Sequence, residues 1–330
     1  MLLEVRDLRV EFRTREGTAH AVNGVSYAVD AGETLAVLGE SGSGKSVTAQ
    51  AIMGILDMPP GRITGGSILF KGQDLLTLKE DARRRIRGAQ IAMIFQDALS
   101  ALNPVLSVGD QLGEMFVVHR GMSKKDARAK AVELMDRVRI PAARERAGQY
   151  PHQFSGGMRQ RVMIAMAMAL EPALIIADEP TTALDVTVQA QVMELLSELR
   201  RELGMGLILI THDLGVVADV ADRIAVMYAG RIVETAPVHD IYKRAAHPYT
   251  AGLLDSIPRL HHKGKELYAI KGLPPSLLDI PPGCPFHPRC PRARDLCRVD
   301  VPPLHDVLPA AGDRRSACHF WKETLDASPS

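Results

Sequence analysis

A glycine-rich loop near the N-terminus constrains the fold of this chain more than any other feature of its sequence. Residues 39–46 read Gly-Glu-Ser-Gly-Ser-Gly-Lys-Ser and fit the pattern G-x-x-x-x-G-K-[ST]. The loop follows the apolar run 33–38, which predicts a strand, and precedes a predicted helix that begins near Lys45. In such a unit, the backbone N–H groups of the loop and the positive end of the helix bind phosphate. The sequence therefore predicts a phosphate-binding site in an α/β fold.

The residues of this loop have separate expected roles. Lys45 is expected to contact the β and γ phosphates of a nucleotide, and the Ser46 hydroxyl is expected to bind Mg²⁺. The glycines allow the backbone to wrap closely around the phosphate groups. The candidate nucleotide-binding residues of the loop are Gly39, Glu40, Ser41, Gly42, Ser43, Gly44, Lys45, Ser46 and Val47.

Two adjacent carboxylates stand at the end of a second apolar run. Residues 174–177 predict a buried strand, and Asp178 and Glu179 follow it directly. Because adjacent strand residues project to opposite sides, one carboxylate can hold Mg²⁺ through water while the other polarises an attacking water. An acidic pair in this position otherwise caps a helix. The phosphate loop favours the catalytic interpretation.

Short β-type runs alternate with helical patterns before residue 256. The predicted strands are residues 33–38, 67–71, 91–95, 173–178, 207–211 and 223–228. Between Val188 and Leu203, apolar residues recur on one helical face, which predicts an amphipathic helix packed on the core. This alternation indicates the α/β class, with helices packed around a mainly parallel sheet.

The distribution of strands and prolines suggests the domain organisation. Residues 107–149 lack a strand-like run and predict two or three helices, inserted as a helical subdomain of about residues 100–170. Eleven of the 21 prolines lie from Pro274 onward, so the tail is expected to have little regular structure. We therefore expect a boundary within residues 256–272. Residues 1–255 would form the nucleotide-binding domain, and residues 256–330 a small irregular Cys-rich C-terminal domain, a regulatory or metal-binding extension.

The composition excludes several classes of protein. The 40 basic and 39 acidic side chains leave a formal charge of +1, so no strong field attracts the chain to nucleic acid or anionic lipid. The apolar content of 46% and charged content of 24% are those of an ordinary globular protein. The longest apolar stretch, Val162–Leu170, has nine residues against the roughly 20 of a membrane helix. The start of the chain is charged too early for a signal peptide, and we expect a soluble chain that is not secreted.

A third motif places a Ser-Gly-Gly turn before a long apolar helical pattern. Ser155, Gly156 and Gly157 begin this predicted helix, whose N-terminus offers a second anion site. Beside a complete phosphate loop, a second such site suggests that it serves a nucleotide on a partner subunit. Along about residues 1–240, the phosphate loop, the Ser-Gly-Gly turn and the acidic pair follow one another in the order typical of the ATP-binding cassette (ABC) ATPases, which the chain therefore resembles. The signature of that family usually reads Leu-Ser-Gly-Gly-Gln, and this chain departs from it at Phe154 and Met158.

The resemblance implies roles for further residues. Gln96 matches the glutamine that reaches Mg²⁺ and water, and Asp185 matches the loop that crosses the dimer interface. His212 matches the histidine at the γ phosphate. For the aromatic side chain that stacks on adenine in the family, Phe12 is the candidate, and His20 could substitute for it.

The implied activity is hydrolysis of ATP, with Mg²⁺, at two composite sites. Each site would combine the phosphate loop of one subunit with the Ser-Gly-Gly turn of the other. Lys45 would stabilise charge on the transferred phosphoryl group, Glu179 would orient or deprotonate water, and His212 would support the γ phosphate. The expected partner is a second, related ABC ATPase subunit or a second copy of this chain.

The C-terminal part resembles one subgroup of the family, the ATPase subunits of bacterial oligopeptide and dipeptide importers and of some nickel importers. The resemblance rests on residues 246–254 (Ala-His-Pro-Tyr-Thr-Ala-Gly-Leu-Leu), on residues 271–276 and on the cysteine pattern that follows. It implies a peripheral protein on the cytoplasmic face of the bacterial cell membrane, with two transmembrane permease subunits and an extracellular substrate-binding protein. Import of nickel or another small solute is one alternative. A soluble ABC ATPase that acts on nucleic acid or ribosomes is another, but such proteins typically carry two cassettes or a long coiled coil, so we expect no nucleic-acid partner.

The cysteines are confined to the C-terminal 47 residues, at Cys284, Cys290, Cys297 and Cys318. In an unexported chain, clustered cysteines more often hold metal than form disulfides. Their spacing lacks the C-x-x-C pairs of zinc ribbons, and four thiolates can hold either Zn²⁺ or an iron–sulfur cluster. Because the importer subgroup includes members with a [4Fe–4S] centre, such a cluster is expected. Zn²⁺, free thiols and disulfides are alternatives, and His287, His305 or His319 could replace one cysteine.

Overall fold

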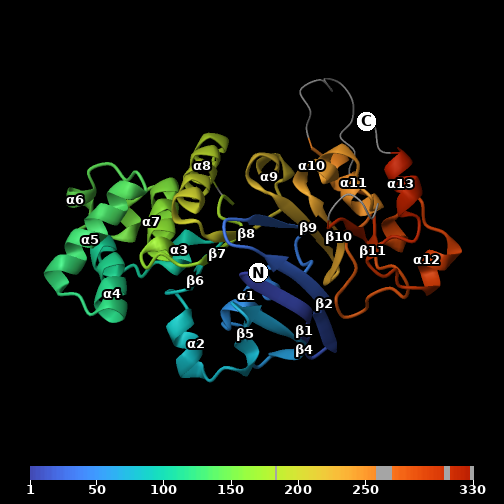
Figure 1. Ribbon diagram of the computed structural model, residues 1–330, viewed down its shortest axis with the longest axis horizontal. Coiled ribbons are helices and arrows are strands. Elements are labelled where there is room, and N and C mark those ends of the chain that lie inside the picture. Colours follow the sequence, from blue (N-terminus) through green and yellow to red (C-terminus); the bar gives the residue numbers. More distant parts are fainter. Residues whose placement is uncertain (183, 258–269, 308–312, 328–330) are drawn as a thin grey trace.

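The structure, a computed structural model, describes residues 1–182, 184–257, 270–307 and 313–327. The described strands form two sheets (Figure 1). The larger sheet has eight strands in the order β11-β12-β10-β9-β3-β8-β7-β6, and the smaller has four in the order β2-β1-β4-β5.

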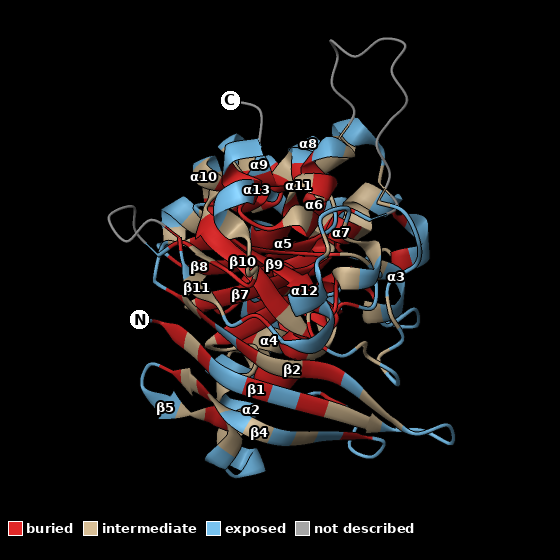
Figure 2. Cartoon of the chain, turned by 90° about the vertical axis from the view of Figure 1, so that its right-hand side faces the viewer, coloured by how far each residue is buried: buried red, intermediate tan, exposed pale blue. Residues whose placement is uncertain are grey.

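The centre of the larger sheet is parallel. It consists of β3 (Thr34–Leu38), β6 (Ile91–Ile94), β7 (Leu174–Asp178), β8 (Gly206–Thr211) and β9 (Arg223–Tyr228). Every residue of β3, β7 and β8 is buried, and Figure 2 shows β7 and β8 in the colour of buried residues. Strands that are covered on both faces consist of nearly continuous apolar runs. These strands lie within one or two residues of five predicted runs, and the α/β class is confirmed.

One edge of the larger sheet is antiparallel. Strand β10 (Arg231–Pro237) returns against β9 through a tight turn in which Ala229 and Gly230 both have positive φ, at 46° and 76°. Strand β12 (Arg315–Ser316) pairs with β10, and β11 (His305–Asp306) pairs with β12. The sheet is therefore mixed, and the prediction of a mainly parallel sheet holds only for its centre.

The smaller sheet was not predicted. Its strands, all antiparallel, are β1 (Leu3–Arg13), β2 (Thr18–Val29), β4 (Gly61–Phe70) and β5 (Gln73–Asp74). The run at residues 67–71 is the end of β4, so its predicted place in the parallel sheet was wrong. Strand β1 lacks a clean alternation because its register shifts between Val5 and Leu8, around Asp7 with a φ of 44°. The strands of this sheet carry interleaved buried and exposed residues (Figure 2).

Five helices connect β6 to β7 and lie together at one end of the molecule (Figure 1). They are α3 (Ala98–Ala101), α4 (Val108–Arg120), α5 (Lys124–Arg137), α6 (Ala143–Arg146) and α7 (Gly156–Met168). The side chains of Ser107, Ser123 and Ser155 cap α4, α5 and α7 by accepting backbone N–H groups. Apolar residues of these helices belong to the same buried cluster as residues of the central strands.

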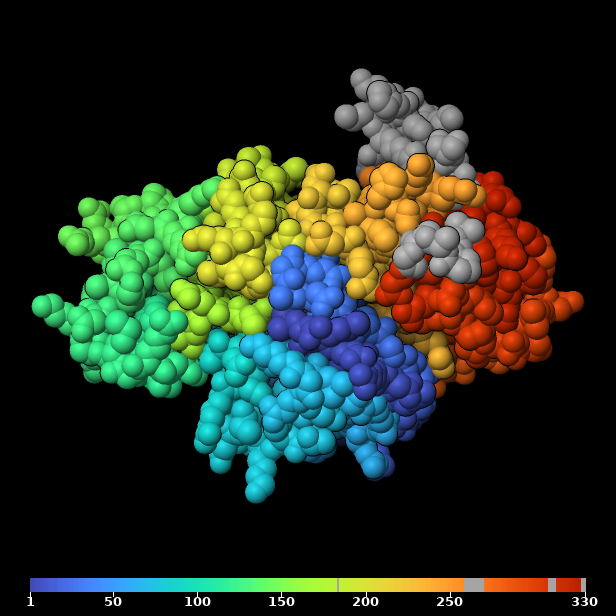
Figure 3. All heavy atoms as spheres, in the orientation of Figure 1, coloured from blue at the N-terminus to red at the C-terminus, as the bar shows by residue number. Residues whose placement is uncertain are grey.

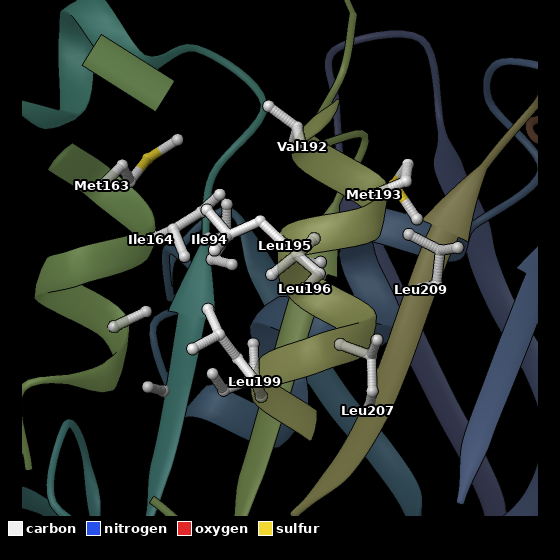
Figure 4. Packing of buried hydrophobic residues seen from close by; sticks show 14 of the residues in the cluster. Ile94, Met163, Ile164, Val192, Met193, Leu195, Leu196, Leu199, Leu207 and Leu209 are labelled. Carbon is white, nitrogen blue, oxygen red and sulfur yellow. The ribbon is translucent and has the colours of Figure 1, made fainter. Parts of the chain in front are cut away.

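Helix α8 (Val186–Leu203) covers the central strands with its apolar face. Val192, Leu195, Leu196 and Leu199 are buried, and they lie among the side chains of β6, β8 and α7 (Figure 4). The predicted amphipathic helix is confirmed, and it begins two residues earlier than expected, where the Asp185 side chain accepts the N–H of Val188.

The other helices before residue 256 lie around these layers. They are α1 (Lys45–Met53), α2 (Glu80–Ile86), α9 (Leu214–Val220), α10 (Val238–Lys243) and α11 (Pro248–Asp255), with single 3₁₀ turns η1 (Leu75–Thr77) and η2 (Pro151–Gln153).

We refer to residues 270–307 and 313–327 as the C-terminal region. It contains η3 (His287–Arg289), α12 (Asp295–Val299), β11, β12 and α13 (Trp321–Ala327). Its atoms lie directly against the rest of the chain (Figure 3), and its strand β12 extends the larger sheet. The predicted boundary at 256–272 falls mainly on residues outside the described part of the chain. The short elements agree with the expectation of little regular structure, but the pairing of β12 with β10 ties this region to the larger sheet.

Candidate functional site

The glycine-rich loop joins the end of β3 to the start of α1, as predicted. Two of its glycines are required by close backbone contacts. A Cβ atom on Gly39 would lie 2.3 Å from the carbonyl oxygen of Met227, and one on Gly44 would lie 2.3 Å from that of Ala21. Gly44 also has a φ of 101°, which other residues rarely adopt. The fold therefore packs this loop tightly against β2 and β9.

Lys45 is held inside the loop. Its side chain is only 5% exposed, and its Nζ donates to the carbonyl oxygens of Gly39 at 2.7 Å and of Glu40 at 3.0 Å. Burial lowers the pKa of Lys45, while the carboxylates of Glu179, Asp178 and Glu40 act in the opposite direction. A buried ammonium with only carbonyl partners is well suited to bind phosphate oxygens.

Ser46 and Asp178 meet at the position expected for Mg²⁺. The Ser46 hydroxyl donates to Oδ1 of Asp178 at 3.0 Å. Burial raises the pKa of Asp178 despite that hydrogen bond. A cation between these groups would offset the energetic cost of burying the Asp178 carboxylate. Mg²⁺ is usually bound through oxygen atoms, with one or two carboxylates and with water and phosphate as the other ligands. Ser46 and Asp178 match this requirement.

Glu179 lies at the centre of a small hydrogen-bonded group. Its Oε2 accepts from Nε2 of Gln96 at 3.1 Å and from Oγ1 of Thr182 at 2.9 Å, and its Oε1 lies 3.4 Å from Nδ1 of His212. Gln96, Glu179 and His212 follow β6, β7 and β8, so the carboxyl edge of three adjacent parallel strands brings them together. Glu179 has a φ of 46°, an unusual conformation for this residue type that is found at functional sites. Thr182 was not predicted, and nothing in its local sequence distinguishes it from a helix-capping residue.

Lys45, Ser46, Gln96, Glu179 and His212 border an open cleft of about 690 Å³, whereas Asp178 and Thr182 lie behind its lining. The cleft is lined by Phe12, Ala19, Ala21, residues 40–47, Gln96, Glu179, His212 and Leu277. Phe12, the candidate for the adenine-stacking residue, is among the residues that line the cleft. The candidate substitute His20 is instead 3.2 Å from the Glu11 carboxylate, and its backbone N–H donates to the Leu277 carbonyl at 2.9 Å. Leu277 belongs to the C-terminal region, and no motif indicated that it would reach this cleft.

The Ser-Gly-Gly turn lies outside this cleft. Ser155 caps α7, where its Oγ accepts the N–H of Met158 at 3.3 Å, and Gly157 lies against Val188 of α8. Asp185 caps α8. Within the described part of the chain, the residues that line the cleft include none of Ser155, Gly156, Gly157 and Asp185.

The four cysteines line one cavity, together with His287 and His319. They form no disulfide, and burial raises the pKa of Cys284 to about 11 and that of Cys318 to about 12. His305 lies in β11, outside the lining of the cavity. Among the described residues, no group of three or more His, Cys, Asp or Glu side chains has an arrangement that could hold a metal ion. As placed in the described part of the chain, the thiols therefore do not themselves complete a metal site, and the [4Fe–4S] or Zn²⁺ site stays a prediction.

Comparison with known families decides what this site belongs to. Residues 22–182 match the family model of ABC transporters, and residues 233–297 match that of the C-terminal region of oligopeptide/dipeptide transporters. The oligopeptide transport ATP-binding protein OppD of Salmonella typhimurium is 53% identical over 325 residues, covering 98% of this chain and 95% of OppD. The chain belongs to the ABC transporter family.

Other members of the family are similarly close. The dipeptide transport ATP-binding protein DppD of Bacillus subtilis is 56% identical over 296 residues, covering 90% of this chain and 88% of DppD. The resemblance to the oligopeptide/dipeptide subgroup is thereby confirmed. As a member of this family, the chain is an ATP-binding subunit with the ATPase fold, and Mg²⁺ is the expected companion of ATP.

Solved structures of ABC proteins share the fold. The dimeric, post-hydrolysis state of the ATP-binding cassette MJ0796, bound to ADP and Pi, matches with a TM-score of 0.65 and 28% identity, covering 72% of this chain and 98% of that cassette. The cbiO1 protein of Clostridium perfringens matches with a TM-score of 0.62 and 29% identity, covering 73% and 90% of the two chains. In the described part of this ABC protein, no helix combines the length and apolar character needed to cross a bilayer.

Proposed function

We propose that this chain is an ATP-binding subunit of a bacterial importer and that ATP hydrolysis in its cleft drives uptake of dipeptides or oligopeptides. The observation that carries the proposal is the match of residues 233–297 to the oligopeptide/dipeptide transporter model, together with relatives named for peptide transport that cover almost the whole chain. The protein would lie peripherally on the cytoplasmic face of the membrane. Its partners would be two transmembrane permease subunits and an extracellular substrate-binding protein.

The proposed ATP site uses two subunits. The Ser-Gly-Gly turn is absent from the lining of the chain's own cleft and stands at the N-terminus of α7, the end of a helix that favours anions. A similar cassette, MJ0796, is dimeric in a state bound to ADP and Pi. In the proposed dimer, Ser155, Gly156 and Gly157 of this chain would contact the nucleotide in the cleft of a second ABC ATPase. Asp185, at the start of α8, would lie at the interface between the subunits.

Within the cleft, each side chain has a proposed task. Lys45 would exchange its carbonyl partners for the β and γ phosphates, and Ser46, Asp178 and Gln96 would hold Mg²⁺ directly or through water. Bound Mg²⁺ would neutralise charge on the phosphates. Glu179 accepts a proton from the attacking water, or orients that water, while its own orientation is maintained by the donors Gln96 and Thr182. His212 lies beside Glu179, on the same side of the cleft. From this position it would interact with the γ phosphate.

We also propose the finer domain organisation expected from the sequence. Helices α3–α7, within about residues 100–170, would form a helical subdomain, because they are contiguous in the chain and grouped at one end of the fold (Figure 1). Residues 1–255 would form the nucleotide-binding domain, and residues 256–330 the cysteine-rich extension. The small buried cluster of Ala246, Val307 and Leu325 joins the two parts.

For the cysteines, we propose a [4Fe–4S] cluster held by Cys284, Cys290, Cys297 and Cys318. Four thiols that line a common cavity support the proposal, and a cluster binds each thiolate to a different iron, so it does not need all four within one ion's coordination sphere. Because burial raises the pKa of Cys284 and Cys318, binding would displace protons from these thiols. Iron, sulfide and zinc should be measured in protein purified without oxygen. About four irons and four sulfides per chain would support the cluster, whereas zinc without iron, or neither metal, would reject it.

Uptake by the reconstituted importer tests the transport proposal. The complex would be assembled in vesicles with its permeases and binding protein, and ATP-dependent uptake of labelled dipeptide, oligopeptide and Ni²⁺ would be compared. The matched control is the same complex carrying Lys45→Ala, in which the phosphate-binding ammonium is removed. Peptide uptake that is lost in the control supports the proposal. Uptake of Ni²⁺ alone, or uptake of neither, contradicts it.

A further inference from the structure

The phosphate loop is in direct contact with the C-terminal region through an ion pair. Nη1 of Arg289 donates to Oε2 of Glu40 at 2.6 Å, and Nη2 donates to Oε1 at 2.9 Å. The pair joins residues 249 positions apart in the chain. Both carboxylate oxygens are engaged, and a two-point contact of this kind fixes orientation as well as charge. The Arg289 side chain is 5% exposed and that of Glu40 is 27% exposed, so solvent screens the pair only in part.

Arg289 is itself held in place by several groups. Its Nε donates to the carbonyl oxygen of Lys271 at 3.2 Å, and its Nη1 lies 3.4 Å from the Tyr228 hydroxyl. The guanidinium also lies over the Tyr228 ring, 5.8 Å from its centroid. Groups of the chain itself therefore fix the position of the guanidinium beside the phosphate loop.

The backbone of Glu40 is held from the same side. Its N–H donates to the hydroxyl of Tyr249 at 2.9 Å. Tyr249 is part of the His-Pro-Tyr segment, and its ring packs on Tyr228 and Phe286, with centroids 4.7 Å and 5.3 Å away. Phe286 also lines the cavity of the cysteines. A continuous set of side chains therefore connects that cavity to the second residue of the phosphate loop.

The charge of Glu40 makes this contact important for nucleotide binding. Glu40 lines the cleft beside Lys45, where a polyphosphate carries several negative charges. Without a partner, the Glu40 carboxylate would repel those phosphates and attract Lys45, which it already influences electrostatically. Arg289 neutralises the carboxylate and turns it toward the C-terminal region.

We propose that Arg289 is a positioning residue of the nucleotide site and that the C-terminal region is therefore part of the chain's own ATP-binding machinery. Leu277 supports this assignment, since it belongs to the same region and lines the same cleft. The inference rests on the proposed placement of the triphosphate on the loop at Lys45. It goes beyond that proposal because it assigns Arg289 a contribution to nucleotide affinity. This contribution should be larger for ATP than for nucleotides with fewer phosphates.

Direct nucleotide binding by the full chain tests the inference. Dissociation constants for ATP and AMP, with Mg²⁺, would be compared between the natural chain and Arg289→Ala. One uncompensated charge in a partly screened site is expected to weaken ATP binding by about tenfold and AMP binding by much less. The matched control is Arg294→Ala, which removes an exposed arginine of the same region that pairs with Glu323 instead of the loop. Its ATP affinity should stay within about twofold of the natural chain.

A second substitution separates the electrostatic role from a structural one. In the double variant Arg289→Ala with Glu40→Gln, the unpaired charge is absent, so ATP affinity should recover most of the loss. A merely structural contact would instead weaken ATP and AMP equally and would not be rescued, and that result overturns the inference. If Arg289→Ala does not fold, the same measurements can be made on Arg289→Met, which keeps the buried aliphatic part of the side chain.

The Lys45→Ala variant distinguishes the inference from the proposal beneath it. If Lys45→Ala still binds ATP normally, the triphosphate does not lie on the loop and both fail. If Lys45→Ala loses ATP binding while Arg289→Ala and Arg289→Met bind ATP as the natural chain does, only the role of Arg289 is refuted.

Discussion

Replacing Glu179 with glutamine should separate ATP binding from ATP hydrolysis. In the structure, Oε2 of Glu179 accepts from Gln96 and Thr182, and Oε1 faces Nδ1 of His212 at 3.4 Å. A glutamine with its amide oxygen in the Oε2 position keeps both acceptor contacts and directs its NH₂ group toward the ring nitrogen of His212. The side chain keeps its size and its partners, so neither the fold nor the cleft should change.

The expected loss is therefore that of the proton acceptor alone. General-base catalysis contributes a factor of about 10²–10⁴, so turnover in Glu179→Gln should decrease by that factor, equivalent to about 3–5 kcal/mol in the barrier. ATP affinity should stay within about twofold. The matched control, Thr182→Val, removes one donor to the same carboxylate but leaves the base, and its turnover should decrease by less than about tenfold.

The assay is ATP hydrolysis by the importer assembled with its partner subunits, with ATP binding measured on the same preparation. Natural turnover in Glu179→Gln would refute the assignment of Glu179 as the base. Loss of binding together with turnover would instead refute the argument that the hydrogen-bonded group survives the substitution.

Three further predictions follow from single contacts. Gly44→Ala would place a Cβ atom 2.3 Å from the Ala21 carbonyl oxygen at a φ of 101°, so equilibrium dialysis should show ATP binding weakened by more than about tenfold; unchanged binding contradicts this. Phe286 is 2% exposed, and Phe286→Ala should lower the apparent free energy of unfolding by about 3–5 kcal/mol in denaturant titrations. A decrease of less than about 1 kcal/mol would mean that the packing of Phe286 does not join the C-terminal region to the cassette. Burial raises the pKa of Glu234 to about 7. Between about pH 4.5 and 7, the folded chain therefore retains a proton that the unfolded chain releases, and the free energy of unfolding decreases as the pH rises through this window. Glu234→Gln should flatten this part of the curve of melting temperature against pH, and an equal slope in both proteins would refute the assignment.

Much of the nucleotide site could be predicted because its parts are local. The Gly39–Ser46 loop, the Asp178–Glu179 pair and the Ser155 cap each depend on a strand or helix and the few residues beside it. Gln96 and His212 were placed by resemblance to a family, and the order of the parallel strands explains why they meet Glu179. Gln96, Glu179 and His212, which border the cleft, were accordingly expected as site residues, but Thr182, a hydrogen-bond partner of Glu179, was not.

The smaller sheet was missed for a physical reason. Its strands are half exposed and interrupted by register shifts, so the alternation that indicates a strand is broken around Asp7. The pairing of β12 with β10 was equally hidden, since β12 is a two-residue strand whose stability comes from its neighbour and not from its own sequence.

The sequence by itself determined the α/β class, the phosphate loop and the family, because local backbone geometry and short motifs carry that information. The tertiary structure alone decided that Leu277 borders the nucleotide cleft and that Arg289 reaches Glu40. Such contacts join residues more than two hundred positions apart, and the sequence around either residue does not indicate which residue it contacts. The packing of Phe286 against Tyr228 and Tyr249, together with the pairing of β12 with β10, holds the C-terminal region where the ion pair can form.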